Sequence, residues 1–304
     1  MTLEDWDRRE GRKDWHDRHG HRGARKKGRS SFSKRVPIIV LGIVIITAGL
    51  GMVAKAYLNH SANAVKLAAP SPKSLDLKFD SKFTGDSLDT HVFGTCYPWV
   101  TGGTGCTNYG NKTDQEKEWY LASQDHVSDG VLSLIAQRQP TAGVTPKGSP
   151  EEYACRSGMI TTYPSFRFEY GYVQVVAKIP FGNGLWSALW LAAANEKWPP
   201  EIDLLEHWHS EAKGAVFLHP LSGVRQGGGV NMPSLSQGYH TFSLEWTPTE
   251  LVWYYDGQQV SSTTTGVPHQ SMYLIANLAD DSLTPGSCSG SMVIKSIKVW
   301  QPAS

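Results

Sequence analysis

Short apolar runs, broken at close intervals by Gly, Pro, Asn and Asp, fill the chain from about residue 77 onward. No stretch of useful length among them repeats its apolar residues with the period of a helix. Many short β-rich runs separated by turn residues are typical of an all-β sandwich or barrel. The clearest runs are residues 131–137, 158–163, 170–180, 185–193, 201–208, 215–220, 240–246, 251–260, 272–279 and 292–301. The sequence therefore predicts one all-β domain over residues 77–304, folded as a sandwich or jelly roll.

The beginning of the chain has a different composition. Residues 1–36 hold twelve Lys and Arg against six Asp and Glu, with too few apolar residues to fold alone. Residues 37–58 contain an apolar run with no charge between Arg35 and Lys55. A helix of nineteen residues spans roughly 28 Å, close to the ~30 Å hydrocarbon core of a bilayer. We therefore expect a disordered basic tail and one transmembrane signal anchor, in preference to a buried helix of a soluble protein.

The charge distribution predicts on which side of the membrane each part lies. Lys and Arg before the apolar run, and few after it, keep the N-terminus cytoplasmic and direct the rest for export. Residues 59–76 are rich in Ala, Ser and Pro and form the predicted linker. The sequence "SANA" at 61–64 offers a signal-peptidase site, so the domain is extracytoplasmic and membrane-anchored or, after cleavage, secreted. We favour the uncleaved anchor.

The exported part is mildly acidic, with sixteen Lys and Arg against twenty-two Asp and Glu in residues 59–304, which argues against a nucleic-acid partner. All four cysteines, Cys96, Cys106, Cys155 and Cys288, lie in this part, where disulfides persist. Four cysteines allow three pairings. The short spacing favours Cys96–Cys106 as a loop staple and leaves Cys155–Cys288 as a long-range bridge, with free buried thiols as the alternative. No CxxC pair or Cys/His cluster indicates zinc, and we expect no metal.

Three carboxylates interrupt the most apolar, Trp-rich part of the domain. In "WPPEIDLLEHWHS" Glu201, Asp203 and Glu206 fall within six positions of a run that is otherwise typical of a buried strand. Alternation points Glu201 and Asp203 to one face of this strand but places Glu206 on the other. One extra residue, a β-bulge at Leu204–Leu205, returns Glu206 to the face of the other acids. A solvated acidic edge strand is the alternative.

Carboxylates gathered on one face have a specific chemical use. A pair separated by about 5–5.5 Å suits retaining glycoside hydrolysis, in which one attacks the anomeric carbon and the other protonates the leaving oxygen and then activates water. Like charges so close should raise the pKa of at least one of them, which keeps the acid protonated near neutral pH.

The hexapeptide "EIDLLE" resembles the E-x-D-x-x-E motif of glycoside hydrolase family 16, the β-jelly-roll group of laminarinases, lichenases and agarases. The stretches "YGYVQVVAKIP", "GLWSALWLAA", "HTFSLEWTPTELVWYYDG" and "IKSIKVWQ" extend the resemblance, in order, over most of residues 77–304. The resemblance implies that Glu201 is the nucleophile, Asp203 an assisting carboxylate and Glu206 the general acid/base. The spacing is similar to that of the laminarinase-like branch. A jelly-roll (concanavalin-like) sandwich with an open, concave substrate groove is the implied fold.

Aromatic residues near the acids are the candidate sugar contacts, because indole faces suit the C–H faces of pyranose rings. They are Trp186, Trp190, Trp198 and Trp208. Trp186 and Trp190 share one face of their run, and sandwich core is the alternative role for both. The resemblance adds His219, near the acid/base, and Asn277, near the groove; a plain surface histidine is the alternative for His219.

These observations predict an exported retaining endo-β-glycosidase acting on β-1,3- or mixed-linked β-glucan. A transglycosylase that remodels an envelope polysaccharide or exopolysaccharide would use the same intermediate, and a non-catalytic carbohydrate-binding module would use the same sandwich but lack an acid. The chemistry requires no cofactor. The resemblance implies a structural calcium in many members, but no compact acidic loop assigns one here. The expected partners are a β-glucan-like polysaccharide and the membrane, through residues 37–58, and we expect a monomer.

Overall fold

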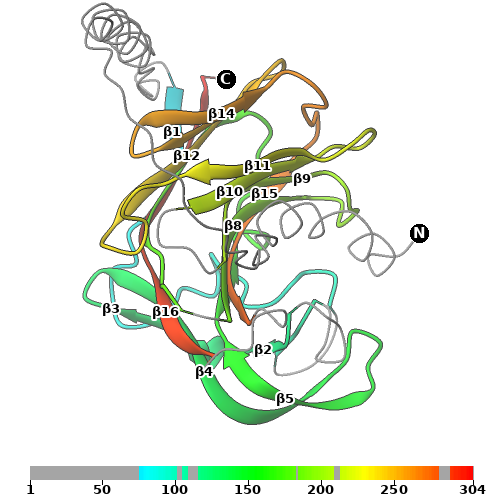
Figure 1. Ribbon diagram of the computed structural model, residues 1–304, viewed down its shortest axis with the longest axis vertical. Helices are drawn as coiled ribbons and strands as arrows, with labels where there is room; N and C mark the ends of the chain where they lie inside the picture. The colour runs from blue at the N-terminus through cyan, green and yellow to red at the C-terminus, as the bar shows by residue number, and fades with distance from the viewer. Residues whose placement is uncertain are drawn as a thin grey trace, which may run out of the picture. The chain divides into compact units, whose positions relative to one another are not determined.

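The computed structural model describes residues 75–100, 105–108, 116–182, 184–208, 213–280 and 288–303. They belong to one compact unit, Leu67–Ser304, in which the strands form two sheets (Figure 1). The ten-stranded sheet consists of β1 (Leu75–Ser81), β2 (Glu118–Tyr120), β3 (Asp125–Ser128), β4 (Val131–Val144), β5 (Pro150–Ser157), β7 (Gly171–Lys178), β12 (His240–Trp246), β13 (Leu251–Tyr255), β14 (Gln258–Thr263) and β16 (Ser289–Pro302). The six-stranded sheet consists of β6 (Met159–Thr161), β8 (Leu185–Ala193), β9 (Glu201–Trp208), β10 (Lys213–His219), β11 (Gln226–Asn231) and β15 (Met272–Asp280). A 3-10 turn, η2, spans Ala122–Gln124.

The order of strands confirms the all-β sandwich. The larger sheet runs β14-β13-β12-β7-β16-β4-β5-β2, with β1 beside β16 and β3 beside β4; the smaller runs β11-β10-β9-β8-β15-β6. Neighbouring strands are antiparallel except for β2 and β5. Each of the ten predicted runs overlaps a strand, and 251–260 falls on the hairpin of β13 and β14. Its two-residue turn, Asp256-Gly257, has positive φ at both positions, as a type I′ turn requires.

The two sheets pack face to face on alternate side chains. In β7, Val173 and Val175 are fully buried between the sheets, whereas Gln174 and Lys178 point away. Burying an aliphatic side chain of this size stabilises the fold by roughly 1.5–3 kcal/mol. The strand β8 is buried along both faces, because one face meets the opposite sheet and the other is covered by aromatic residues. One face of the six-stranded sheet is therefore packed against the ten-stranded sheet.

The structure adds strands where the sequence analysis predicted none: β1, β2, β3, β5 and β11. The first of them begins at Leu75, inside the segment expected to be linker. The predicted basic tail (1–36), the predicted transmembrane anchor (37–58) and nearly all of the predicted linker (59–76) lie outside the described residues. Within the part that the structure describes, no helix is long and apolar enough to cross a bilayer.

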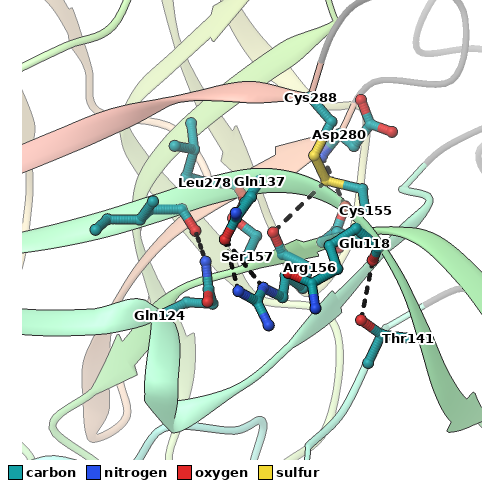
Figure 2. Close-up of a disulfide and its surroundings, with 12 residues drawn as sticks. Glu118, Gln124, Gln137, Thr141, Cys155, Arg156, Ser157, Leu278, Asp280 and Cys288 are labelled. Carbon is teal, nitrogen blue, oxygen red and sulfur yellow. Dashed lines mark hydrogen bonds between the residues drawn. A yellow bond between two sulfur atoms is a disulfide. The ribbon is translucent and has the colours of Figure 1, made fainter.

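Both predicted disulfides are present, and no thiol is left free. Cys96–Cys106 closes a short loop. Cys155–Cys288 joins β5 to the residue preceding β16, across 133 positions of sequence. Figure 2 shows the second bridge beside the carboxyl groups of Glu118 and Asp280. The alternative of free thiols was therefore wrong.

Removing Cys155–Cys288 should cost more stability than removing Cys96–Cys106, because the first bridge closes a loop of 133 positions and the second a loop of ten. Loop-closure entropy predicts losses of about 5 and about 3 kcal/mol. Paired Cys→Ala variants of each bridge, unfolded in urea, would measure both losses. Equal losses would show that chain entropy in the unfolded state is not the dominant contribution.

Glu118 gives the fold an unusual pH dependence. Its side chain is fully buried, and one carboxyl oxygen accepts a hydrogen bond from the Asp280 amide at 2.7 Å. Burial raises the pKa of Glu118 from 4.5 to about 8; backbone hydrogen bonds oppose the rise, while the Asp280 carboxylate adds to it. The folded state therefore holds a proton that the unfolded chain releases above about pH 4.5.

It follows that the contribution of Glu118 to stability falls as pH rises from about 4.5 to about 8. Glu118→Gln keeps the shape without the charge, so at pH 9 it should be more stable than the native protein by roughly a few kcal/mol, and near pH 4 about equal. Urea unfolding across this range is the measurement, with the exposed Glu152→Gln on β5 as the matched control. A pH dependence unchanged in Glu118→Gln would contradict the assignment.

Candidate active site

The three acids lie on one face of β9 because the strand contains one extra residue. On β8, Leu189 pairs with Leu205 and the next residue pairs with Asp203, which leaves Leu204 without a partner position. The same irregularity recurs against β10. This is the predicted bulge, and it returns Glu206 to the side of Glu201 and Asp203. We call this side of the six-stranded sheet the acidic face.

The bulge is supported from the opposite sheet. Trp253 of β13 reaches across the core and donates its indole N–H to the carbonyl of Asp203 at 2.8 Å. Small residues stand opposite the outer two acids, since Ala192 pairs with Glu201 and Ala188 pairs with Glu206. Alanine side chains at these positions add little bulk next to each carboxylate.

Two tryptophans hold the outer acids. Trp198 donates its indole N–H to Oε2 of Glu201, and Trp186 donates to Oε1 of Glu206, both at 3.1 Å. The ring of Trp186 lies 5.2 Å from that of Trp208, its cross-strand partner. All three tryptophans are partly exposed on the acidic face, and Trp186 and Trp198 thereby combine the positioning of an acid with aromatic surface.

His219 of β10 stands between the first two acids. Its Nε2 lies 3.3 Å from Oε1 of Glu201 and 3.5 Å from Oδ2 of Asp203. The residue was expected near the acid/base, but the structure places it against the nucleophile candidate, because His219 pairs with Glu201 in the register of β9 and β10. The ring of Trp198 lies beside the imidazole, 5.7 Å away.

Asp203 is the most buried of the acids, with 3% of its surface exposed. Burial raises its pKa from 3.8 to about 8, and the positive charge of Arg225 partly opposes the rise. A raised pKa was predicted within this group from like charges, but for Asp203 the cause of the rise is loss of hydration. At neutral pH Asp203 therefore mainly carries a proton and adds little negative charge beside Glu201.

Trp190 and Asn277 form the buried end of the acidic face. Trp190 pairs with Asp203, and its indole N–H donates to Oδ1 of Asn277 at 2.8 Å. The Asn277 amide in turn donates to the hydroxyl of Tyr120 at 2.9 Å. With both amide atoms engaged and the side chain buried, Asn277 positions Trp190 and does not itself present a surface to a ligand.

Two aromatic residues that follow Cys96, and that the sequence analysis missed, pack against this end. Tyr97 and Trp99 stack at 4.8 Å, and the Trp99 ring lies 6.4 Å from that of Trp190. Nothing in the sequence around them indicates which part of the sheet they cover. Phe217 was also missed, although it shares a strand face with His219 and strict alternation predicts its position. The Arg225 guanidinium lies 4.4 Å above the Phe217 ring.

Among the residues that the structure describes, two groups of side chains have the residue types and proximity that a metal needs. Cys155, Asp280 and Cys288 are one group, but both sulfurs are in the disulfide. Glu201, Asp203 and His219 are the other, with one candidate ligand atom each, all within 4.8 Å of one another.

Comparison with known proteins agrees with this geometry. The model of the glycosyl hydrolases family 16 matches residues 112–290. Endo-1,3-1,4-beta-glycanase EglC of Rhizobium meliloti is 32% identical over 196 residues, 60% of this chain and 40% of that protein. The related ExsH of the same organism is 32% identical over 178 residues, 54% of this chain and 37% of that protein. The chain thus spans about two fifths of these curated relatives.

Among solved structures, the catalytic domain of an endo-1,3-beta-glucanase (laminarinase) from Thermotoga petrophila superimposes with a TM-score of 0.63. The alignment covers 76% of this chain and 99% of that domain, at 24% identity. At this identity the likeness concerns the fold, a sandwich of the same architecture.

The indole N–H groups of Trp186 and Trp198 should contribute to the rate of any reaction at these acids beyond what an aromatic ring at the same position contributes. Trp186→Phe and Trp198→Phe keep an aromatic ring but remove a hydrogen bond to a carboxylate, which typically contributes about 1.5–3 kcal/mol. If these acids catalyse hydrolysis, kcat should fall by roughly 10- to 100-fold in each variant.

Trp208→Phe is the matched control, because the Trp208 N–H has no hydrogen-bond partner among the described residues. Its loss of kcat should be smaller. Equal losses in all three variants would indicate that ring area, and not the hydrogen bonds, determines the effect.

Proposed function

The chain belongs to the glycosyl hydrolases of family 16, and we propose that it is a retaining endo-β-glycosidase that hydrolyses β-1,3- or mixed-linked β-glucan. The observation that carries the proposal is the bulge of β9, which gathers Glu201, Asp203 and Glu206 on one face. The named activities of the bacterial glycanases and the laminarinase fold support the choice of substrate.

In the proposed reaction Glu201 attacks the anomeric carbon while Glu206 donates a proton to the departing glycosidic oxygen. A covalent glycosyl-enzyme forms and the downstream glucan leaves. Glu206, now a carboxylate, then removes a proton from water, whose oxygen attacks the same carbon and releases Glu201. Two displacements leave the β-configuration unchanged. No cofactor takes part, and we assign no calcium.

The groups around the acids support these roles. The indole N–H of Trp198 orients Glu201 for attack, and that of Trp186 orients Glu206 toward the leaving oxygen. Asp203, buried and largely protonated at neutral pH, keeps repulsion low beside an ionised Glu201. This assigns opposite protonation states to two neighbouring carboxyls, as a charged nucleophile in a partly buried site requires.

Sugar rings are proposed to lie along the acidic face. Trp186 and Trp208 offer aromatic surface beside Glu206, and Trp198 offers it beside Glu201. Trp190 is buried, which favours the packing role over the sugar contact that was expected of it; the partly exposed Trp99 beside it extends the aromatic surface past Asp203. Indole rings supply contact area to the C–H faces of pyranoses while leaving hydroxyls in water.

We further propose that the domain acts outside the cytoplasm, tethered by residues 37–58 or released after cleavage near 61–64. The support is the uncharged apolar run behind a basic tail. Two disulfides in the folded unit agree with an oxidising compartment.

The experiment that tests the function is release of reducing ends by the full chain from laminarin, mixed-linked β-glucan, agarose and xyloglucan. Release from a β-glucan, with fragments of intermediate length appearing first, is the expected result. Glu201→Gln and Glu206→Gln should each reduce kcat by a factor on the order of 10⁴ or more. Proton NMR of the first products should show the β-anomer.

Glu245→Gln on β12, in the opposite sheet, is the matched control and should retain activity. A folded native protein that releases no reducing ends from any of these polymers would overturn the hydrolase proposal. In that case transfer to a labelled glucan acceptor would identify a transglycosylase, and retained binding without either reaction a carbohydrate-binding module.

A further inference from the structure

We propose that Glu201, Asp203 and His219 form a binding site for a single Zn²⁺ ion, which inhibits the enzyme reversibly by occupying the nucleophile. The binding site stands on the geometry of these residues alone. The inhibition rests on the proposed function, in which Glu201 must be unliganded to attack.

The distances from the histidine to the two carboxylates fit a tetrahedral ion. Nε2 of His219 lies 3.3 Å from Oε1 of Glu201 and 3.5 Å from Oδ2 of Asp203, and all three atoms lie within 4.8 Å of one another. Ligand atoms about 2.1 Å from zinc in a tetrahedron are about 3.4 Å apart. Both separations match this edge, so the histidine needs little movement to bind the ion with either carboxylate.

The ligand atoms are directed by the fold. Trp198 holds Oε2 of Glu201, which leaves Oε1 on the side of the histidine. Oδ2 of Asp203 is buried and receives no hydrogen bond from the described residues. A buried oxygen without a hydrogen bond has lost the stabilisation that water would give it. A cation bound by this oxygen, the imidazole and the second carboxylate would replace that stabilisation.

The residue types select the ion. One imidazole and two carboxylates suit zinc, whereas calcium and magnesium prefer six or more oxygen ligands. Thiolates are the strongest competitors for zinc in most proteins, but all four cysteines here are in disulfides. Three protein ligands leave a fourth position for water, as in open zinc sites.

Some charges around the site favour binding of a cation and one opposes it. Glu201 provides negative charge for a divalent cation, and Asp203 adds to it once the ion displaces its proton. The rings of Trp198 and Phe217 beside the imidazole strengthen the attraction by excluding water. Arg225, whose positive charge acts on Asp203, opposes binding. An affinity weaker than that of a structural zinc site follows, which makes the inhibition reversible and open to competition by glucan.

The test uses Co²⁺ as a spectroscopic substitute for zinc in the full chain, after treatment with a chelator. Tetrahedral Co²⁺ absorbs visible light far more strongly than Co²⁺ in water. We expect titration to produce this absorption for one ion per chain, and added Zn²⁺ or a laminarin oligosaccharide to abolish it. Because the readout is absorption, it does not depend on catalysis.

His219→Asn and Glu201→Gln should each lose the absorption, and His126→Asn, the same change at an exposed histidine of β3, should keep it. All variants keep the same N-terminal residues, so cobalt bound by histidines there contributes equally to each. The His126 variant shows whether loss of any one histidine reduces the absorption. Circular dichroism establishes that each variant is folded. Absorption unchanged in both folded site variants, or absent from the native protein, would overturn the site.

The two proposals can fail separately. Glucan hydrolysis with no cobalt absorption would leave the hydrolase standing and overturn the metal site. Cobalt absorption that requires His219 and Glu201, in a protein that hydrolyses no glucan, would support the site and overturn the proposed function. If both hold, Zn²⁺ should raise KM for glucan without changing kcat; inhibition of kcat alone would overturn the assignment to the nucleophile.

Discussion

The extra residue in β9 is the constraint on which the site depends. Without it, alternation would turn Glu206 toward the packed interior between the sheets, and an unpaired carboxylate there would cost several kcal/mol. With it, the apolar side chains of the strand face the opposite sheet and all three acids face outward. Trp253, which donates to the Asp203 carbonyl, fastens the irregular point of the strand to the other sheet.

Packing between the two sheets stabilises the strand that carries three neighbouring acids, an arrangement that is otherwise unfavourable. Carboxylates side by side repel, and burial raises the energy of each charged form. The structure reduces these costs differently at each position. Glu201 and Glu206 accept indole hydrogen bonds, whereas Asp203 stays largely protonated at neutral pH. The fully buried Glu118, far along the chain, follows the same rule with a pKa of about 8. Loss of hydration thus sets the charge state at two separate places in the fold.

Much of the architecture could be predicted from local pattern. Runs with apolar and turn residues at strand spacing became strands, and the Asp256-Gly257 turn formed where an aromatic strand met an Asp-Gly pair. The missed strand β1 alternates apolar and polar residues, but other missed strands lack that pattern. The strand β11 reads "QGGGVN", typical of a loop, and exists because β10 offers it a pairing edge. The strand β5 begins "PEE" and pairs with both β4 and β2. Pairing with distant strands overrode weak local propensity.

The sequence by itself determined the class of fold, the acids of β9 and the bulge that unites them, because alternation and like-charge repulsion are local rules that act within one strand. Only the tertiary structure decided that His219 meets Glu201, that Asn277 supports Trp190, and that Trp99 covers this end of the acidic face. These contacts join residues from separate strands and loops. Their partners are set by cross-strand register and by the path of a disulfide-closed loop, neither of which local spacing along the chain encodes.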